Sequence, residues 1–215
     1  MKKYLLLLLL LFNTNISYAQ KATQRWGISS AWLVQNAPFR EFASFQLNRI
    51  WYAQGIDTWD IGEASSGIAV GFSYDVTAKN GLMFRIQGIV ESTGWISGVF
   101  DIGTGVRVPM SLKNSFFSIE AYFSINQTGG TLHRIGSGEK TIPDSIDFYM
   151  GLFGFKTRLA FEFPIGQKFF ITPYVSYAVY PWQKSSTKAD LILNGFSKGS
   201  LIDSLQIGFE FGSKF

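Results

Sequence analysis

The final stretch, Leu201 to Phe215, reads LIDSLQIGFEFGSKF and alternates in polarity. One parity is largely apolar and includes Leu205, Ile207, Phe209, Phe211 and Phe215. The other parity is polar or small and includes Gln206, Gly208, Glu210, Gly212 and Lys214. Because successive side chains of a β-strand point to opposite faces, this stretch predicts a strand with one apolar and one polar face.

The same two-faced pattern recurs along the chain, separated by turn residues. We expect eight strands, at residues 25–34, 67–77, 82–91, 100–108, 117–125, 149–163, 169–182 and 201–215. In 169–182 both parities are aromatic or apolar, which leaves the orientation of that strand open.

The connections between these strands differ in length. Residues 78–81, 109–114 and 164–168 are short turns, and Asn80-Gly81 is a typical hairpin dipeptide. Residues 35–66, 126–146 and 183–200 are long, and the connection at 92–96 is of modest length. In an antiparallel meander the three short turns share one end with both termini, which is the asymmetry of outer-membrane barrels. The pattern predicts an all-β fold, a closed antiparallel eight-stranded transmembrane β-barrel with meander topology.

The long connection 35–66 does not alternate cleanly. We interpret it as a loop, with two alternatives for Phe39 to Tyr52. Asn36-Ala37-Pro38 could begin a short helix, or Phe45 to Tyr52 could add a hairpin.

The polar faces of the strands separate this chain from a soluble sandwich, since charged residues cannot form an apolar core. Turned inward in an eight-stranded barrel, they can pair with one another and fill the lumen. The predicted interior network comprises Arg85, Asp101, Arg107, Glu120, Lys156, Arg158, Glu162 and Glu210. We favour a salt-bridged filling over the alternative, a path for protons or small ions, because a lone buried charge is costly.

The beginning of the chain is typical of a secretory signal peptide. Lys2 and Lys3 precede the apolar run Leu5 to Phe12, and Ser17-Tyr18-Ala19 is a cleavage sequence. We expect residues 1–19 to be removed and residues 20–215 to form one outer-membrane barrel domain. The net charge of +4 is too small to predict a nucleic-acid partner, and the absence of cysteine excludes disulfides.

The chain resembles the small OmpA/OmpX-type outer-membrane barrels of Gram-negative bacteria. In that family the last strand ends on an aromatic residue preceded by alternating hydrophobic residues. Ile207, Phe209, Phe211 and Phe215 match this assembly signal, whereas Ser213 departs from it. The resemblance implies insertion by the barrel-assembly machinery into the outer membrane, next to lipid and lipopolysaccharide. It implies no single activity, because such barrels include adhesins, enzymes and structural proteins.

Few residues suggest a catalytic or metal-binding site. His133 is the one histidine, and Ile135 occupies the place where lipid A deacylases of similar shape carry a serine. We therefore favour a solvated loop histidine over a catalytic pair of His133 with Ser137. Asp57, Asp60 and Glu63 could hold a cation, but an exposed acidic loop is the preferred interpretation. We expect no catalytic residue, no metal and no cofactor.

Basic and aromatic residues mark the two expected rims. Lys79, Lys113 and Lys168, one in each short turn, and Lys184, Lys188 and Lys198 could meet anionic lipid groups. Aromatic girdles are expected from Trp26, Phe163, Phe169 and Phe215 at one rim and Trp32, Trp95, Tyr149 and Trp182 at the other.

The sequence thus predicts a non-enzymatic outer-membrane barrel that is structural or adhesive and binds any protein partner through its outer loops. One alternative is a lipid A-modifying enzyme, which should bring a histidine, a serine and a carboxylate together near the outer rim. Another is a subunit of a larger envelope or secretion assembly, with an apolar loop patch formed by Phe39, Phe42, Phe45 and Trp51.

Overall fold

The computed structural model describes residues 22–35, 59–60, 66–92, 96–112, 114–134, 145–185 and 202–215. These residues form eight long strands and one two-residue strand. The strands are β1 (Thr23–Gln35), β2 (Trp59–Asp60), β3 (Ser66–Thr77), β4 (Leu82–Ser92), β5 (Ile96–Pro109), β6 (Phe116–Arg134), β7 (Ser145–Ile165), β8 (Phe169–Ser185) and β9 (Ile202–Lys214).

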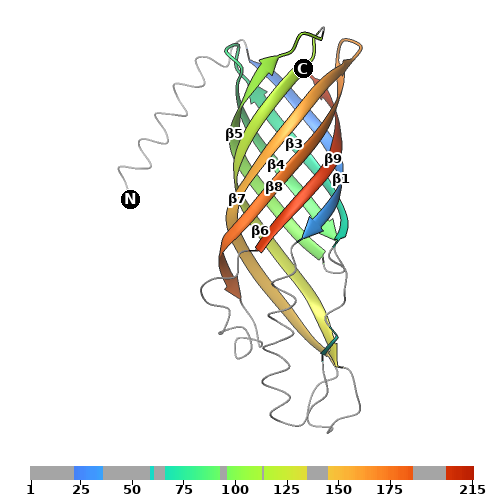
Figure 1. The fold of residues 1–215 in the computed structure, drawn as a ribbon, viewed down its shortest axis with the longest axis vertical. Helices are drawn as coiled ribbons and strands as arrows, with labels where there is room; N and C mark the ends of the chain where they lie inside the picture. Colours follow the sequence, from blue (N-terminus) through green and yellow to red (C-terminus); the bar gives the residue numbers. More distant parts are fainter. Residues whose placement is uncertain are drawn as a thin grey trace, which may run out of the picture.

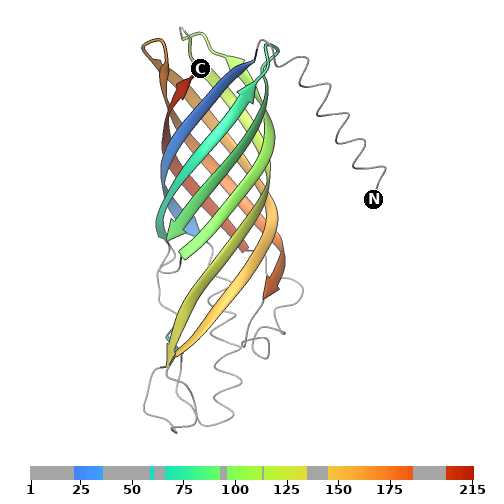
Figure 2. The same cartoon turned by 180° about the vertical axis from the view of Figure 1, so that it is seen from behind.

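The eight long strands close into an antiparallel barrel with meander topology, as predicted. Each pairs with its neighbour along the chain, and β1 pairs with β9 to complete the ring. Figures 1 and 2 show a tall barrel of tilted strands, with the C-terminus at the same end as the three short connections. We call this the turn end and the opposite end the loop end. No helix among the described residues is long and apolar enough to cross a membrane.

The turn at 78–81 shows how local sequence sets a hairpin. Gly81 N donates to Ala78 O at 3.0 Å, and Ala78 N donates to Leu82 O at 2.8 Å. Gly81 has a φ of 84°, whereas Asn80 has an ordinary φ and accepts a hydrogen bond from Leu82 N. Glycine at this third loop position is the usual solution for a three-residue hairpin.

The polarity of the barrel is inverted relative to a soluble protein. Large apolar side chains lie on the outside and are about half exposed, for example Trp32 (54%), Ile68 (64%) and Phe209 (60%). Charged side chains lie inside, where Arg158 and Glu210 are each 2% exposed. The structure also settles the orientation of β8. Its even-numbered residues from Phe170 to Tyr180 are buried, and the odd-numbered ones face outward or are partly covered.

The prediction of a loop across residues 126–146 was wrong over much of its length. β6 runs on to Arg134, β7 begins at Ser145, and the two remain paired as far as His133 and Ser145. Both views show these strands projecting past the rest of the barrel (Figures 1 and 2). Beyond the barrel wall a hairpin needs only its backbone pairing, so its side chains need not alternate and the sequence signal fades.

A short strand within residues 35–66 was not predicted. β2 pairs with the projecting part of β6, with Trp59 opposite Arg134 and Asp60 opposite His133. The suggested helix or hairpin between Phe39 and Tyr52 lies outside the described residues, as does the signal peptide.

Candidate functional site: the barrel interior

The interior side chains form three tiers along the barrel axis. The turn-end tier comprises Arg25, Asp75, Arg107, Glu162 and Lys214. Arg25 lies 2.7 Å from Asp75 Oδ1 and also pairs with Glu162. Glu162 Oε1 accepts from Arg107 at 2.5 Å and from Lys214 at 2.8 Å. One carboxylate therefore joins cations from three strands.

Two aromatic rings line the same tier. The guanidinium of Arg107 lies 3.6 Å from the ring centre of Phe116, and that of Arg25 lies 5.5 Å from Phe170. The Lys214 ammonium is within 6 Å of both rings, at 5.9 and 5.7 Å. A cation over an aromatic face is attracted by the ring quadrupole, so these rings help to hold the basic side chains in place.

The central tier comprises Arg85, Glu120, Tyr122, Arg158 and Glu210. Arg158 lies 2.9 Å from Glu210 and 3.3 Å from Glu120. Arg85 pairs with Glu210 and is 3.9 Å from Glu120. The hydroxyl of Tyr122 donates to Glu120. Two arginines and two carboxylates thus form a ring of ion pairs in the middle of the barrel, and Arg85 links this ring to Asp75 of the turn-end tier at 3.5 Å.

The loop-end tier comprises Glu91, Asp101, Asn126, Lys156 and Gln206. Lys156 Nζ lies 3.0 Å from Asp101 and donates to Gln206 Oε1 at 3.2 Å. Glu91 accepts from Gln206 and, at 3.5 Å, from Asn126. No cation pairs with Glu91 among the described residues. Amides, rather than cations, solvate this buried carboxylate.

Glycines on β5 make room for the central tier. Gly103 lies opposite Tyr122 and Gly105 lies opposite Glu120 on β6. A Cβ atom at Gly103 would collide with the backbone of Ala121 and the ring of Tyr122. An eight-stranded barrel has room for side chains but not for a wide channel. Small residues on one strand therefore accommodate large residues on the next.

The structure brings all eight predicted interior residues into these tiers. Sequence reasoning left several partners out of the network, namely Arg25, Asp75, Glu91 and Lys214. Strand parity carried the signal, since Glu91 shares the buried face of β4 with Arg85, and Asp75 shares the buried face of β3 with Ser73. Arg25 stands near the start of β1, where few alternating residues precede it.

The residues of the predicted assembly signal lie on the outer surface. Ile207 is 50% exposed, Phe209 60%, Phe211 49% and Phe215 75%. Phe215 N donates to Gln24 O at 3.0 Å, so the backbone of this residue is attached to β1 while its side chain is exposed. Recognition of these residues by an assembly machinery stays a prediction.

The structure corrects the placement of His133. It lies in β6 rather than in a loop, opposite Ser145 of β7 and opposite Asp60 of β2. The backbone register therefore places Asp60, His133 and Ser145 in one row across three adjacent strands. Ser137, Asp57 and Glu63 lie outside the described residues. Among the residues that the structure describes, no group of three or more histidine, cysteine or acidic side chains is placed to hold a metal ion.

Comparisons with known proteins establish the fold and no more. No family model matches the chain, and no curated protein matches it. The crystal structure of Neisserial surface protein A aligns with a TM-score of 0.54 and 11% identity, over 90% of this chain and 99% of that one. The shared architecture agrees with the closed eight-stranded barrel. Membership of the OmpA/OmpX-type family stays a prediction.

A second solved structure aligns too weakly to support any inference about this chain. It is an acetoacetate decarboxylase-like enzyme from Sphingomonas wittichii RW1, with a TM-score of 0.16 and 10% identity over 89% of each chain.

Proposed function

We propose that this protein is a non-enzymatic barrel of the bacterial outer membrane, with a structural role or an adhesive role carried by its loop end. The observation that supports this most is the inverted polarity. Apolar side chains are exposed on all eight long strands, from Ile28 on β1 to Phe211 on β9. Monomeric soluble proteins rarely expose apolar patches beyond a few hundred Å². Lipid is the environment that such a belt suits.

Aromatic residues near both rims support the membrane assignment. At the turn end, Phe169 stacks on Phe211 with ring centres 5.8 Å apart. Toward the loop end, Trp182 packs edge-on against Phe155 at 5.5 Å. Aromatic girdles at both interfaces are typical of membrane barrels. Lys79 and Lys168 are exposed in the turns, where they can meet anionic lipid groups.

The filled interior supports a role other than transport. Ion pairs cross the lumen in all three tiers. Large side chains such as Leu33, Met83 and Tyr180 are also fully buried. A solute would have to break several buried ion pairs to pass. The projecting ends of β6 and β7 offer a surface to a protein partner at the loop end.

The experiment is fractionation of cells that produce the full chain, followed by electrophoresis with and without boiling and by conductance measurements in planar bilayers. The proposal predicts an outer-membrane protein whose mobility changes on heating and which opens no steady channel. Recovery in the soluble fraction would contradict it, and so would a stable conductance from the purified protein.

A second candidate, a lipid A-modifying enzyme, is favoured by one observation. The register row of Asp60, His133 and Ser145 has the order of a hydrolytic triad, with the base between the acid and the nucleophile. The test is mass spectrometry of lipid A from cells producing the protein. Loss of an acyl chain that depends on both His133 and Ser145, but not on Gln127 farther back along β6, would favour this function. Unchanged lipid A would count against it.

A further inference from the structure

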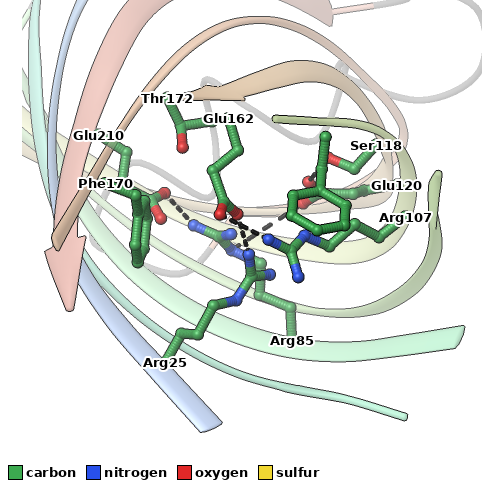
Figure 3. A pocket seen from close by; sticks show the side chains of 10 residues that line it. Arg25, Arg85, Arg107, Ser118, Glu120, Glu162, Phe170, Thr172 and Glu210 are labelled. Carbon is green, nitrogen blue, oxygen red and sulfur yellow. Dashed lines mark hydrogen bonds and ion pairs between the residues drawn. The ribbon is translucent and has the colours of Figure 1, made fainter. Parts of the chain in front are cut away.

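Glu91, near the loop end of β4, is a buried carboxyl group that no cation contacts among the described residues. It is 2% exposed. Every other buried carboxylate that the structure describes pairs with at least one arginine or lysine, and these are Asp75, Asp101, Glu120, Glu162 and Glu210. Figure 3 shows this arrangement for Glu162, which faces the guanidinium groups of Arg25 and Arg107. Glu91 is therefore the exception within the filling of the barrel.

The count of buried charges also leaves one carboxyl group over. The five buried cations of the described interior are Arg25, Arg85, Arg107, Lys156 and Arg158. Six buried carboxyl groups face them, the five paired ones and Glu91. Lys214, a further cation, is 22% exposed at the turn end and remains in contact with water. A buried carboxylate without a cation is costly, and in practice such a group takes up a proton.

Gln206 fixes the role of one oxygen of Glu91. Gln206 Oε1 accepts from Lys156 Nζ at 3.2 Å and from Ser176 Oγ at 3.3 Å. Because a lysine ammonium can only donate, the amide oxygen must lie on its side and the amide nitrogen on the side of Glu91. Gln206 Nε2 accordingly donates to Glu91 Oε1. This oxygen is an acceptor in either protonation state, which leaves Oε2 as the atom to carry a proton.

Asn126 supplies an acceptor for that proton. Its Nδ2 lies 3.5 Å from Glu91 Oε2, and its Oδ1 is buried without a hydrogen-bond partner among the described residues. A half-turn of the amide exchanges these two atoms and brings Oδ1 to the carboxyl group. A neutral carboxylic acid has one O–H donor, so it gives Oδ1 the partner that buried polar atoms nearly always have. A carboxylate only accepts and would leave this oxygen unpaired.

The other neighbours of Glu91 offer no free positive charge. On the flanking strands it lies opposite Ala69 of β3 and Ser97 of β5, which are uncharged. Its titratable neighbours inside the barrel are Asp101, Lys156 and Tyr180. Lys156 is already paired with Asp101 at 3.0 Å, and Asp101 repels a second negative charge. The surroundings therefore suit a neutral group better than a carboxylate.

We propose that Glu91 is a proton-binding site of the folded barrel, a neutral carboxylic acid whose Oε2–H group donates to Asn126. The bound proton removes the unpaired charge and needs no cavity of its own. Each tier then holds equal numbers of buried cations and carboxylates among the described residues, two of each at the turn end, two of each in the centre and one of each at the loop end.

Infrared spectroscopy of the purified barrel at neutral pH, in a detergent without carbonyl groups, is the direct test. A protonated carboxyl group absorbs apart from carboxylates and amides. We expect one such band, which should move when the protein carries isotope-labelled glutamate and should be absent from Glu91→Gln. Absence of the band from the original protein would overturn the proposal. A band that does not respond to the glutamate label, or that persists in the variant, would overturn it as well, because the proton would then lie on another group.

Heat unfolding in the same detergent provides a second test. Glu91→Gln keeps one donor and one acceptor, so its unfolding midpoint should lie within about 3 °C of the original. Glu210→Gln is the matched variant, and it should lower the midpoint by about 6–20 °C because Arg85 and Arg158 lose a buried counter-charge. An equal fall for Glu91→Gln would mean that Glu91 is ionised and paired, and a rise of similar size would mean that it is ionised and unpaired. Either result would contradict the proposal.

Discussion

Arg158 on β7 and Glu210 on β9 form an ion pair of 2.9 Å, although β8 lies between their strands in the barrel wall. The pair therefore crosses the interior instead of following the wall. Arg85 reaches the same carboxylate from β4, on another part of the wall. A single buried carboxylate thus joins three strands that do not pair with one another, in addition to the backbone bonds that close the barrel.

Removing Glu120 should destabilise the barrel strongly. Glu120→Ala leaves Arg158 and Arg85 without one of their partners and removes the acceptor of Tyr122. Breaking a buried ion pair by deleting one partner costs about 3–5 kcal/mol. Urea unfolding of the protein in detergent micelles would measure the decrease in the free energy of unfolding.

Two control variants accompany Glu120→Ala, one at the same position and one on the surface. Glu120→Gln keeps one of the two acceptor oxygens that the hydroxyls of Ser118 and Tyr122 use but loses the other and the charge, so we expect an intermediate cost. Lys168→Ala, in an exposed turn, should change the stability by less than about 0.5 kcal/mol. If Glu120→Ala unfolded at the same urea concentration as the original protein, the stabilising role of the filling would be wrong.

A charged side chain on the outer surface should lower the stability of the barrel only where lipid covers that surface. Phe209→Arg, near the middle of β9, should lower the stability in bilayers by about 2–4 kcal/mol, whereas Gln127→Arg near the loop end should cost about 0–1 kcal/mol. Refolding titrations into lipid vesicles would measure both. Equal, small effects at the two positions would argue for a water-exposed surface.

The sequence was most informative where the two faces of a strand meet different environments. On β3, Ile68 and Phe72 alternate with Ala69 and Ser73, and the predicted orientation was confirmed. On β8 both faces carry aromatic residues, because Phe170 and Tyr174 pack inside against arginines while Phe169 and Tyr177 lie outside. Alternation cannot orient such a strand without knowledge of its interior partners.

The pairing between β7 and β8 contains an irregularity that depends on a glycine. The register shifts between Phe153 and Phe155, and a Cβ atom at Gly154 would overlap the carbonyl oxygen of Val179. Gly154→Ala should therefore cost about 1–3 kcal/mol, the range for overpacking. Gly88→Ala is the matched control, because a Cβ there meets nothing within 4 Å. The two unfolding free energies can be compared in the same urea series, and equal values would contradict the packing at Gly154.

Phe215→Ala separates assembly from stability. The side chain of Phe215 is 75% exposed, so its removal should leave the unfolding free energy of refolded protein within about 0.5 kcal/mol. If the residue acts as an assembly signal, the amount inserted into the outer membrane should nevertheless fall several-fold, measured by quantitative immunoblotting of membrane fractions. Normal insertion of the variant would contradict the assembly role.

The projecting part of β6 at the loop end could not be predicted from the sequence, for a different reason. Alternation reports a boundary between two environments, and β6 beyond Gly129 pairs with β7 but no longer with β5. The pairing of β2 with β6 is equally invisible, because Trp59 and Asp60 are too few residues to show a period. The row formed by Asp60, His133 and Ser145 could not be anticipated for this reason.

The central claim is that the apolar face of the barrel meets lipid. Because the chain has no cysteine, a single nitroxide label can be placed by Phe209→Cys and its collisions measured in reconstituted bilayers. The account predicts frequent collisions with oxygen dissolved in the lipid and almost none with a water-soluble nickel complex. A label at this position that collides freely with the nickel complex would show that the face is in water and would contradict the account.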